Sequence, residues 1–139
     1  MGEVDYARIF DVLPSPFMIL DAQTRFVAAN QAYLATTGRP LEDLLGQKMF
    51  ELFPNPGDSG RRLGESVQKV LATGQPDTLA YLHYPISGAD GVVEDRYWTA
   101  VHVPILDAAG RVEYVMQNTV DVTEFARMIN ILVITPLRI

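Results

Sequence analysis

Hydrophobic and polar residues alternate most regularly in two neighbouring segments, residues 96–105 and 111–123. Both segments are rich in aromatic and β-branched side chains, which favour β-strands. The residues between them, 106–110, include an aspartate and a glycine, as tight turns do. The pattern therefore predicts a long β-hairpin at the centre of a sheet, followed by a helix that begins near Glu124.

The rest of the chain predicts an α+β fold in which the sheet is mostly antiparallel. Apolar residues at helical spacing indicate helices, and glycine or proline marks their ends. The expected helices span residues 4–13, 31–37, 41–45 and 61–73, with a further apolar turn at 49–54. The expected earlier strands span 17–20, 25–29 and 78–86, and residues 55–59 and 87–93 are expected to be loops. Asn30 stands directly before a helix, where we interpret it as the N-cap.

Composition narrows the classes of function. The chain has 139 residues and a net charge of −6, without a cluster of Lys or Arg, so neither nucleic acid nor an anionic membrane is an expected partner. It has no cysteine, which excludes disulfides, thiolate metal sites and cysteinyl-flavin photochemistry. No apolar run is long enough to span a bilayer. We expect a single-domain cytoplasmic module.

The sequence contains no recognisable set of catalytic residues. There is no nucleophile–histidine–acid pattern, no HExxH motif and no phosphate-binding loop. His83 or His102 could serve as a general base, but the sequence offers no acid that would orient either ring. Proton sensing by either imidazole is a further interpretation. We therefore expect the domain itself not to be an enzyme.

Short motifs along the chain resemble those of the PAS domain, a sensory module of bacterial histidine kinases and related signalling proteins. They are Leu13-Pro14-Ser15-Pro16-Phe17, Ala29-Asn30-Gln31-Ala32-Tyr33-Leu34, Thr37-Gly38, Leu44-Leu45-Gly46, Phe53-Pro54, Tyr97-Trp98, Val103-Pro104, Gly110 and Asp121-Val122-Thr123-Glu124. The resemblance implies a five-stranded antiparallel sheet with helices over one face, and a role in sensing or dimerisation. It divides the chain into a flanking helix (1–13), the PAS domain (14–124) and the start of a linker helix to an effector domain, or a tail (125–139).

The resemblance also implies which strand residues point under the helices. These inward residues are Trp98, Ala100, His102, Val115, Gln117 and Thr119, together with His83 from the third strand. Five of them form the candidate pocket: His83, Trp98, His102, Gln117 and Thr119. The polar ones need hydrogen-bond partners, which a small polar or carboxylate metabolite, water or the protein itself could supply. Trp98 either stacks on a ligand or anchors the core.

The opposite face of the two central strands is strongly apolar. Its residues are Tyr97, Thr99, Val101, Val103, Tyr114, Met116 and Val120. A patch of this kind is rarely left in contact with water. We expect the N-terminal helix or the same face of a second subunit to cover it. A homodimer built on Val101, Val103, Tyr114 and Met116 is therefore an alternative to ligand sensing.

The resemblance argues against two common cofactors. Haem-binding members carry their histidine on the helices, and no expected helix here has one. Flavin-binding members use a glutamine where this chain has Thr119 and an asparagine where it has Trp98. We therefore expect neither cofactor.

Asp121 and Thr123 resemble the exit motif of the family. In the family the aspartate typically pairs with a basic residue, and we propose Arg96 as its partner. The motif would relay a conformational change in the last two strands to the outgoing helix. In the alternative interpretation, Asp121 simply caps that helix. Residues 131–136 are too uniformly apolar for a solvated coiled coil, so the tail could also pack on the outer sheet face or on a partner.

Overall fold

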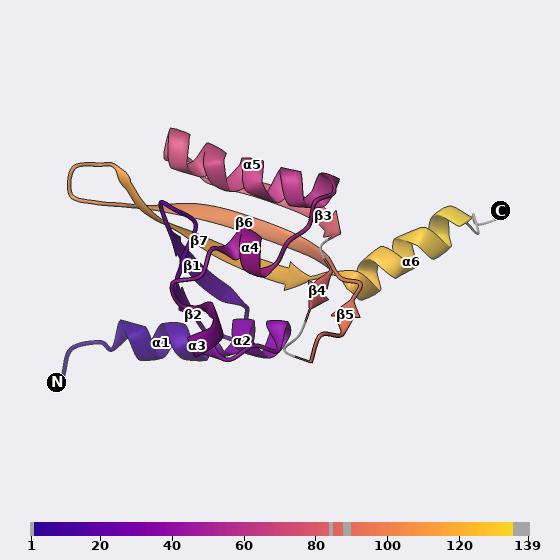
Figure 1. Ribbon diagram of the computed structural model, residues 1–139, viewed down its shortest axis with the longest axis horizontal. Helices are drawn as coiled ribbons and strands as arrows, with labels where there is room; N and C mark the ends of the chain where they lie inside the picture. Colours follow the sequence, from indigo (N-terminus) through magenta and orange to yellow (C-terminus); the bar gives the residue numbers. More distant parts are fainter. Residues whose placement is uncertain (1, 84, 88–89, 135–139) are drawn as a thin grey trace.

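The computed structural model describes residues 2–83, 85–87 and 90–134. Its core is a five-stranded antiparallel sheet in the order β2-β1-β7-β6-β3 (Figure 1). The strands are β1 (Phe17–Asp21), β2 (Phe26–Ala29), β3 (Asp77–His83), β6 (Tyr97–Leu106) and β7 (Val112–Asp121). A separate two-stranded ribbon pairs β4 (Ile86–Ser87) with β5 (Val93–Glu94). The predicted α+β class and five-stranded sheet are confirmed.

Helices cover one face of this sheet, and the last helix projects away from it (Figure 1). In chain order, the helices of the described chain are α1 (Tyr6–Val12), α2 (Gln31–Thr37), α3 (Leu41–Leu44), α4 (Met49–Leu52), α5 (Asp58–Thr73) and α6 (Thr123–Ile134). The helix α5 begins three residues before the expected start, because Gly57 opens it and Asp58 already pairs with Arg61 in its first turn. Asn30 caps α2 as predicted, accepting a hydrogen bond from the backbone amide of Tyr33.

The central hairpin has the expected turn. Strands β6 and β7 pair from Trp98 opposite Asp121 to Leu106 opposite Val112. At the turn, Oδ1 of Asp107 accepts hydrogen bonds from the backbone amides of Ala109 and Arg111, at 2.9 and 3.0 Å. Gly110 has φ +83°, a conformation that favours glycine.

The core lies between the sheet and the helices. Large fully buried side chains are Met18, Leu20, Phe26, Leu44, Val67, Val70, Leu82 and Val115. Exposure alternates along β6, where Trp98, Ala100 and His102 are buried, while Tyr97, Thr99 and Val101 on the other face are only half-buried. The predicted inward and outward faces of this strand are therefore confirmed.

His83 does not point inward, so this part of the sequence prediction is wrong. Asp77 and Leu79 face His102 and Ala100 in register, but Leu82 rather than Tyr81 faces Trp98. The strand thus has one extra residue, a β-bulge, which reverses the alternation beyond it. His83 consequently faces Tyr97 on the outer side, where the two rings stack with centroids 4.8 Å apart.

Neither α1 nor the described part of α6 covers the outer face of β6 and β7. The helix α1 lies beside α2, with Asp11 hydrogen-bonded to Gln31, and meets the sheet where Phe10 contacts Phe17. Helix α6 runs away from the sheet through residue 134 (Figure 1). Of the two covers expected for this face, the N-terminal helix is therefore not the one, and the second subunit stays a prediction. The packing proposed for the tail is absent through residue 134. Residues 135–139 lie outside the described part of the chain.

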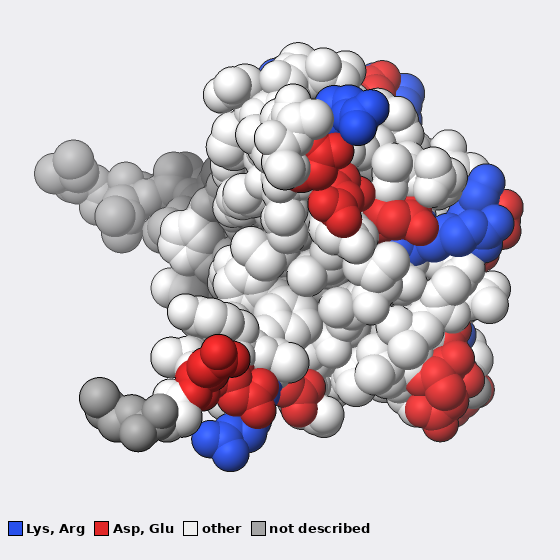
Figure 2. Space-filling view, turned by 90° about the vertical axis from the view of Figure 1, so that its left-hand side faces the viewer, with Lys and Arg blue, Asp and Glu red and all other residues white. Residues whose placement is uncertain are grey.

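Charged side chains are mixed on the surface. On the side shown in Figure 2, acidic and basic groups lie in small separate groups around a broad uncharged region. Among the described residues, none of the helices is both long and apolar enough to cross a membrane. The same residues include no cluster of three or more His, Cys, Asp or Glu suited to a metal ion.

Candidate functional site

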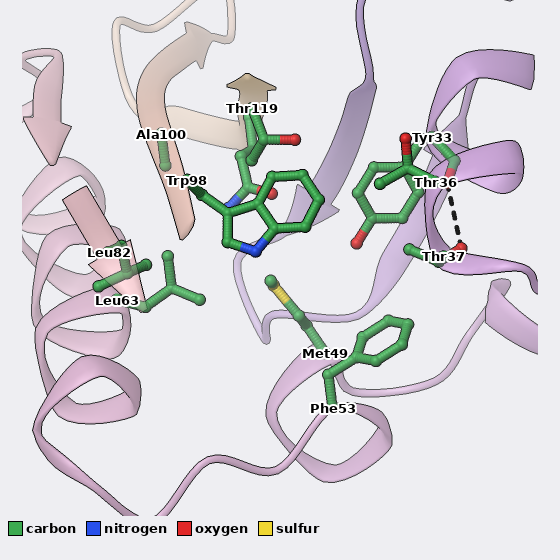
Figure 3. A pocket seen from close by; sticks show the side chains of 11 residues that line it. Tyr33, Thr36, Thr37, Met49, Phe53, Leu63, Leu82, Trp98, Ala100 and Thr119 are labelled. Carbon is green, nitrogen blue, oxygen red and sulfur yellow. Dashed lines mark hydrogen bonds between the residues drawn. The ribbon is translucent and has the colours of Figure 1, made fainter. Parts of the chain in front are cut away.

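A small cavity lies between the inner face of the sheet and the helices. It is lined by Tyr33, Thr36, Thr37, Met49, Phe53, Leu63, Leu82, Trp98, Ala100, Gln117 and Thr119. Figure 3 shows the indole of Trp98 in the midst of these side chains. The cavity has a volume of about 40 Å³. Ligand pockets usually span about 300–1,000 Å³, so in this conformation Trp98 leaves room for only a very small molecule.

Three of the five pocket residues proposed from the sequence line this cavity: Trp98, Gln117 and Thr119. His102 lies behind Gln117, with the Nε2 atoms of the two side chains 2.9 Å apart. His83 lies on the opposite face of the sheet, where its Nε2 is 3.1 Å from Oδ1 of Asp95.

Two residues that were not expected from the sequence, Ser66 and Asp77, complete the polar surroundings of His102. Nδ1 of His102 is 2.7 Å from Oγ of Ser66, and this hydroxyl donates a hydrogen bond to Oδ2 of Asp77 at 2.6 Å. Oδ1 of Asp77 also lies 3.3 Å from Nζ of Lys69. A hydrogen-bonded chain, called here the polar chain, thus runs from Lys69 through Asp77, Ser66 and His102 to Gln117. A serine on the otherwise apolar face of α5 was the signal that could have revealed it.

The polar chain lacks the arrangement of a hydrolytic triad. In a triad the histidine lies between the acid and the nucleophile. Here Ser66 lies between Asp77 and His102, and both Ser66 and His102 are buried. The hydrogen bond from Ser66 holds the pKa of Asp77 below its ordinary value despite partial burial, with help from Lys69. Asp77 is therefore ionised and accepts hydrogen bonds.

His102 makes stability dependent on pH. Burial lowers the pKa of His102 to about 4, against the attraction of Asp77. An unfolded histidine, with a pKa near 6.5, takes up a proton that the folded state does not bind. The free energy of unfolding is therefore expected to fall by about 1.4 kcal/mol per unit as pH drops from 6.5 towards 4. Urea unfolding at several pH values measures this slope, and an equal slope in His102→Gln would contradict the assignment.

A second polar cluster joins β6, β7 and α6. Arg96 Nη1 pairs with Oδ2 of Asp121, as the sequence analysis proposed for these two residues. Oδ1 of Asp121 accepts hydrogen bonds from the amide (2.9 Å) and the hydroxyl of Thr123, the first residue of α6. Oγ1 of Thr123 in turn accepts a hydrogen bond from the amide of Tyr97 at 3.0 Å. Partial burial alone would raise the pKa of Asp121, but the hydrogen bonds from Thr123 and Arg96 hold it below its ordinary value.

Comparisons with known proteins point to one family. A family model described as the PAS fold matches residues 10–127. A relative, the Blue-light-activated histidine kinase of Rhizobium johnstonii, is 25% identical over 126 residues, which cover 88% of this chain and 34% of the kinase. The chain therefore spans about a third of the length of that relative.

Solved structures show the same fold. The PAS domain of BvgS from Bordetella pertussis is 23% identical with a TM-score of 0.66, and the match covers 90% of this chain and 89% of that one. A light-oxygen-voltage domain studied with a flavin analogue is 20% identical with a TM-score of 0.67, covering 92% and 93% of the two chains. At these identities the likeness extends to the fold alone.

Proposed function

This chain belongs to the PAS family, and on that premise we propose that it is a ligand-responsive sensor domain of a histidine-kinase-type signalling protein. PAS domains are sensory rather than catalytic modules, and the chain is homologous to the sensor region of a histidine kinase. In this proposal a small molecule occupies the cavity beside Trp98. Its binding changes how β6 and β7 hold the start of α6, which leads to an effector domain of the same protein.

The strand register carries this proposal. Trp98, which lines the cavity, is the direct cross-strand partner of Asp121, and Asp121 binds the first residue of α6. The preceding residue, Tyr97, forms hydrogen bonds with the two residues that follow Asp121. Its carbonyl accepts a hydrogen bond from the amide of Val122 at 2.8 Å, and its amide donates one to the hydroxyl of Thr123. A shift of β6 at Trp98 would therefore move the start of α6 through Tyr97 and Asp121. A ligand can drive such a shift only by binding one arrangement more tightly than the other.

We propose that the cavity does not hold a flavin, although one structural neighbour is a light-oxygen-voltage domain studied with a flavin analogue. The indole of Trp98 occupies the space between the sheet and the helices, and about 40 Å³ remains beside it. The sequence also has no cysteine to form a flavin adduct. We therefore propose a ligand much smaller than a flavin. Mass spectrometry of small molecules released on denaturation tests this directly, and a stoichiometric flavin would contradict it.

Asp121→Ala is expected to loosen the start of α6 without unfolding the domain. The change removes the ion pair with Arg96 and the two hydrogen bonds with Thr123. A helix-start bond of this kind contributes about 1 kcal/mol, so amide hydrogen exchange in the first turn of α6 should become about five- to tenfold faster.

Asp95→Ala serves as the matched control for this measurement. Asp95 is an exposed carboxylate one residue before Arg96, and its Oδ1 lies 3.1 Å from Nε2 of His83. Its loss should leave the exchange rates of α6 unchanged. Equal rates in wild type and Asp121→Ala would show that Asp121 does not hold the helix.

A second candidate function, homodimerisation, is favoured by the outer face of the sheet. Met116 lies between Ile19 of β1 and Val103 of β6 in the strand register, which makes a continuous apolar row across three strands. Val101, Val103, Tyr114 and Met116 are each half-buried in the single chain. Such a row stabilises a dimer when the same face of a second subunit covers it.

Met116→Glu is expected to dissociate a dimer that uses this face, because the interface would then bury an unpaired carboxylate. Light scattering after size exclusion, at several protein concentrations, measures the mass. Gln23→Glu adds the same charge at the exposed β1–β2 turn and should leave the mass unchanged. A dimer that survives Met116→Glu with an intact fold does not use this face.

A further inference from the structure

We propose that the carbonyl oxygen of Gln117 faces the cavity and determines which ligands it accepts, favouring a small uncharged molecule that donates a hydrogen bond. This inference rests on the proposed function and adds the chemical class of the ligand. Simple amides and alcohols belong to that class, whereas carboxylates do not.

The polar chain fixes the orientation of the Gln117 side chain. Asp77 is ionised and only accepts, so the single proton of the Ser66 hydroxyl is directed to its Oδ2. Oγ of Ser66 must then accept from Nδ1 of His102, which places the ring proton on Nδ1.

The other ring nitrogen of His102 carries no proton in this neutral tautomer. Nε2 of His102 can therefore only accept, and the group 2.9 Å away on Gln117 must be the donating amide nitrogen. The carboxamide of Gln117 cannot rotate by half a turn without placing its oxygen against this acceptor. Asp77, Ser66 and His102 are thus positioning residues for Gln117.

The oxygen of Gln117 is left to the cavity. Gln117 is one of the lining residues, and no described residue donates a hydrogen bond to its Oε1. The cavity lining within the described chain includes no Lys, Arg or His. A carboxylate would meet a carbonyl oxygen there with no cation to offset its charge, whereas an N–H or O–H donor would complete the polar chain.

The test compares two probes of nearly the same shape, acetamide and acetate, at pH 7. Titration of the ¹⁵N-labelled wild-type protein, followed through the Trp98 indole and Gln117 amide signals, gives both affinities. A missing hydrogen bond to a buried group typically changes affinity at least about tenfold, so acetamide is expected to bind at least about tenfold more tightly. Equal affinities, tighter binding of acetate or no binding of acetamide would overturn the inference.

Variants show which residue is responsible for the preference for acetamide over acetate. Gln117→Met keeps the length of the side chain but lacks the carbonyl oxygen, and should lower acetamide affinity about tenfold, to that of acetate. Thr99→Val removes a hydroxyl from the outer face of the sheet and should leave the preference unchanged. The inference is wrong if Gln117→Met keeps the preference and Thr119→Val, which removes the other hydroxyl-bearing strand residue of the cavity, abolishes it.

A measurement without any probe keeps the inference testable if Gln117→Met does not fold. Long-range ¹H–¹⁵N correlation spectra of the wild-type imidazole report which nitrogen of His102 carries the proton. The expected tautomer has the proton on Nδ1, and a proton on Nε2 would overturn the argument.

The inference and the proposed function can fail separately. If acetamide binds selectively but hydrogen exchange in α6 stays the same, the relay is wrong and Gln117 still selects the ligand. If both probes bind equally and both change α6, the selection by Gln117 is wrong and the relay stands.

Discussion

Trp98→Ala is expected to lower the free energy of unfolding by about 3–5 kcal/mol, the usual cost of removing a buried tryptophan side chain. Trp98 is only 5% exposed and lies among the apolar side chains of the cavity. The variant should also acquire a cavity with the shape of the missing ring. Free indole is then expected to bind and to restore part of the stability, since a ligand that binds only the folded state stabilises it.

Urea unfolding with and without indole measures both effects. Tyr6→Ala removes an aromatic side chain that is 76% exposed and should change the stability by less than about 0.5 kcal/mol. Indole should not stabilise the wild-type protein, in which Trp98 fills the space. A Trp98→Ala variant that is destabilised but unaffected by indole would show that the inner face closes over the gap and offers no site.

Asn30→Ala is expected to lower the free energy of unfolding by about 3 kcal/mol, well beyond the usual effect of a helix cap, about 1 kcal/mol. Asn30 is fully buried. Its Oδ1 accepts from the amides of both Tyr33 and Phe17, each at 3.0 Å, and its Nδ2 donates to the carbonyl of Ser15 at 2.9 Å. Alanine would leave these backbone groups without their partner, at about 1–3 kcal/mol for each buried group.

Asn55→Ala is the matched comparison for Asn30→Ala. Asn55 is half-buried and also accepts a hydrogen bond from a backbone amide, that of Gly57 at 3.2 Å. Its loss should cost about 1 kcal/mol or less. Similar losses in the two variants would show that Asn30 acts only as a helix cap and does not join α2 to the start of β1.

The central hairpin could be predicted from the sequence because period-two alternation is a local signal. The buried Trp98 and the half-buried Tyr97 follow directly from it. His83 could not be placed by the same rule, since an unpaired extra residue in β3 reverses the alternation. No local feature of residues 77–83 indicates this bulge, because the bulge arises from the pairing of β3 with β6.

The candidate site was predictable on the sheet side only. Gln117 and Thr119 were found because resemblance and alternation fix the inward face of β7. The helical side, with Met49 and Leu63, requires knowledge of how the short helices cover the sheet. The link from Ser66 to His102 joins residues 36 positions apart and becomes visible only when α5 is packed on β6.

The role of Asn30 could likewise be predicted from the sequence only in part. Its role as N-cap follows from its place before α2, a local pattern. Its second hydrogen bond, to the amide of Phe17, joins residues 13 positions apart. This contact depends on how the β1–β2 hairpin brings the start of α2 beside the start of β1, which the local pattern does not contain.

Hydrogen exchange in α6 of Trp98→Ala, with and without saturating indole, tests the central claim most directly. The experiment shows whether filling the cavity changes the exchange rates of the amides in the first turn of the helix, residues 123–126. The amides of α1 serve as an internal reference. We predict that indole changes exchange in α6 but not in α1, and that adding Asp121→Ala abolishes the change. Indole that binds and stabilises the variant while α6 and α1 respond alike would contradict a relay from the cavity to the helix.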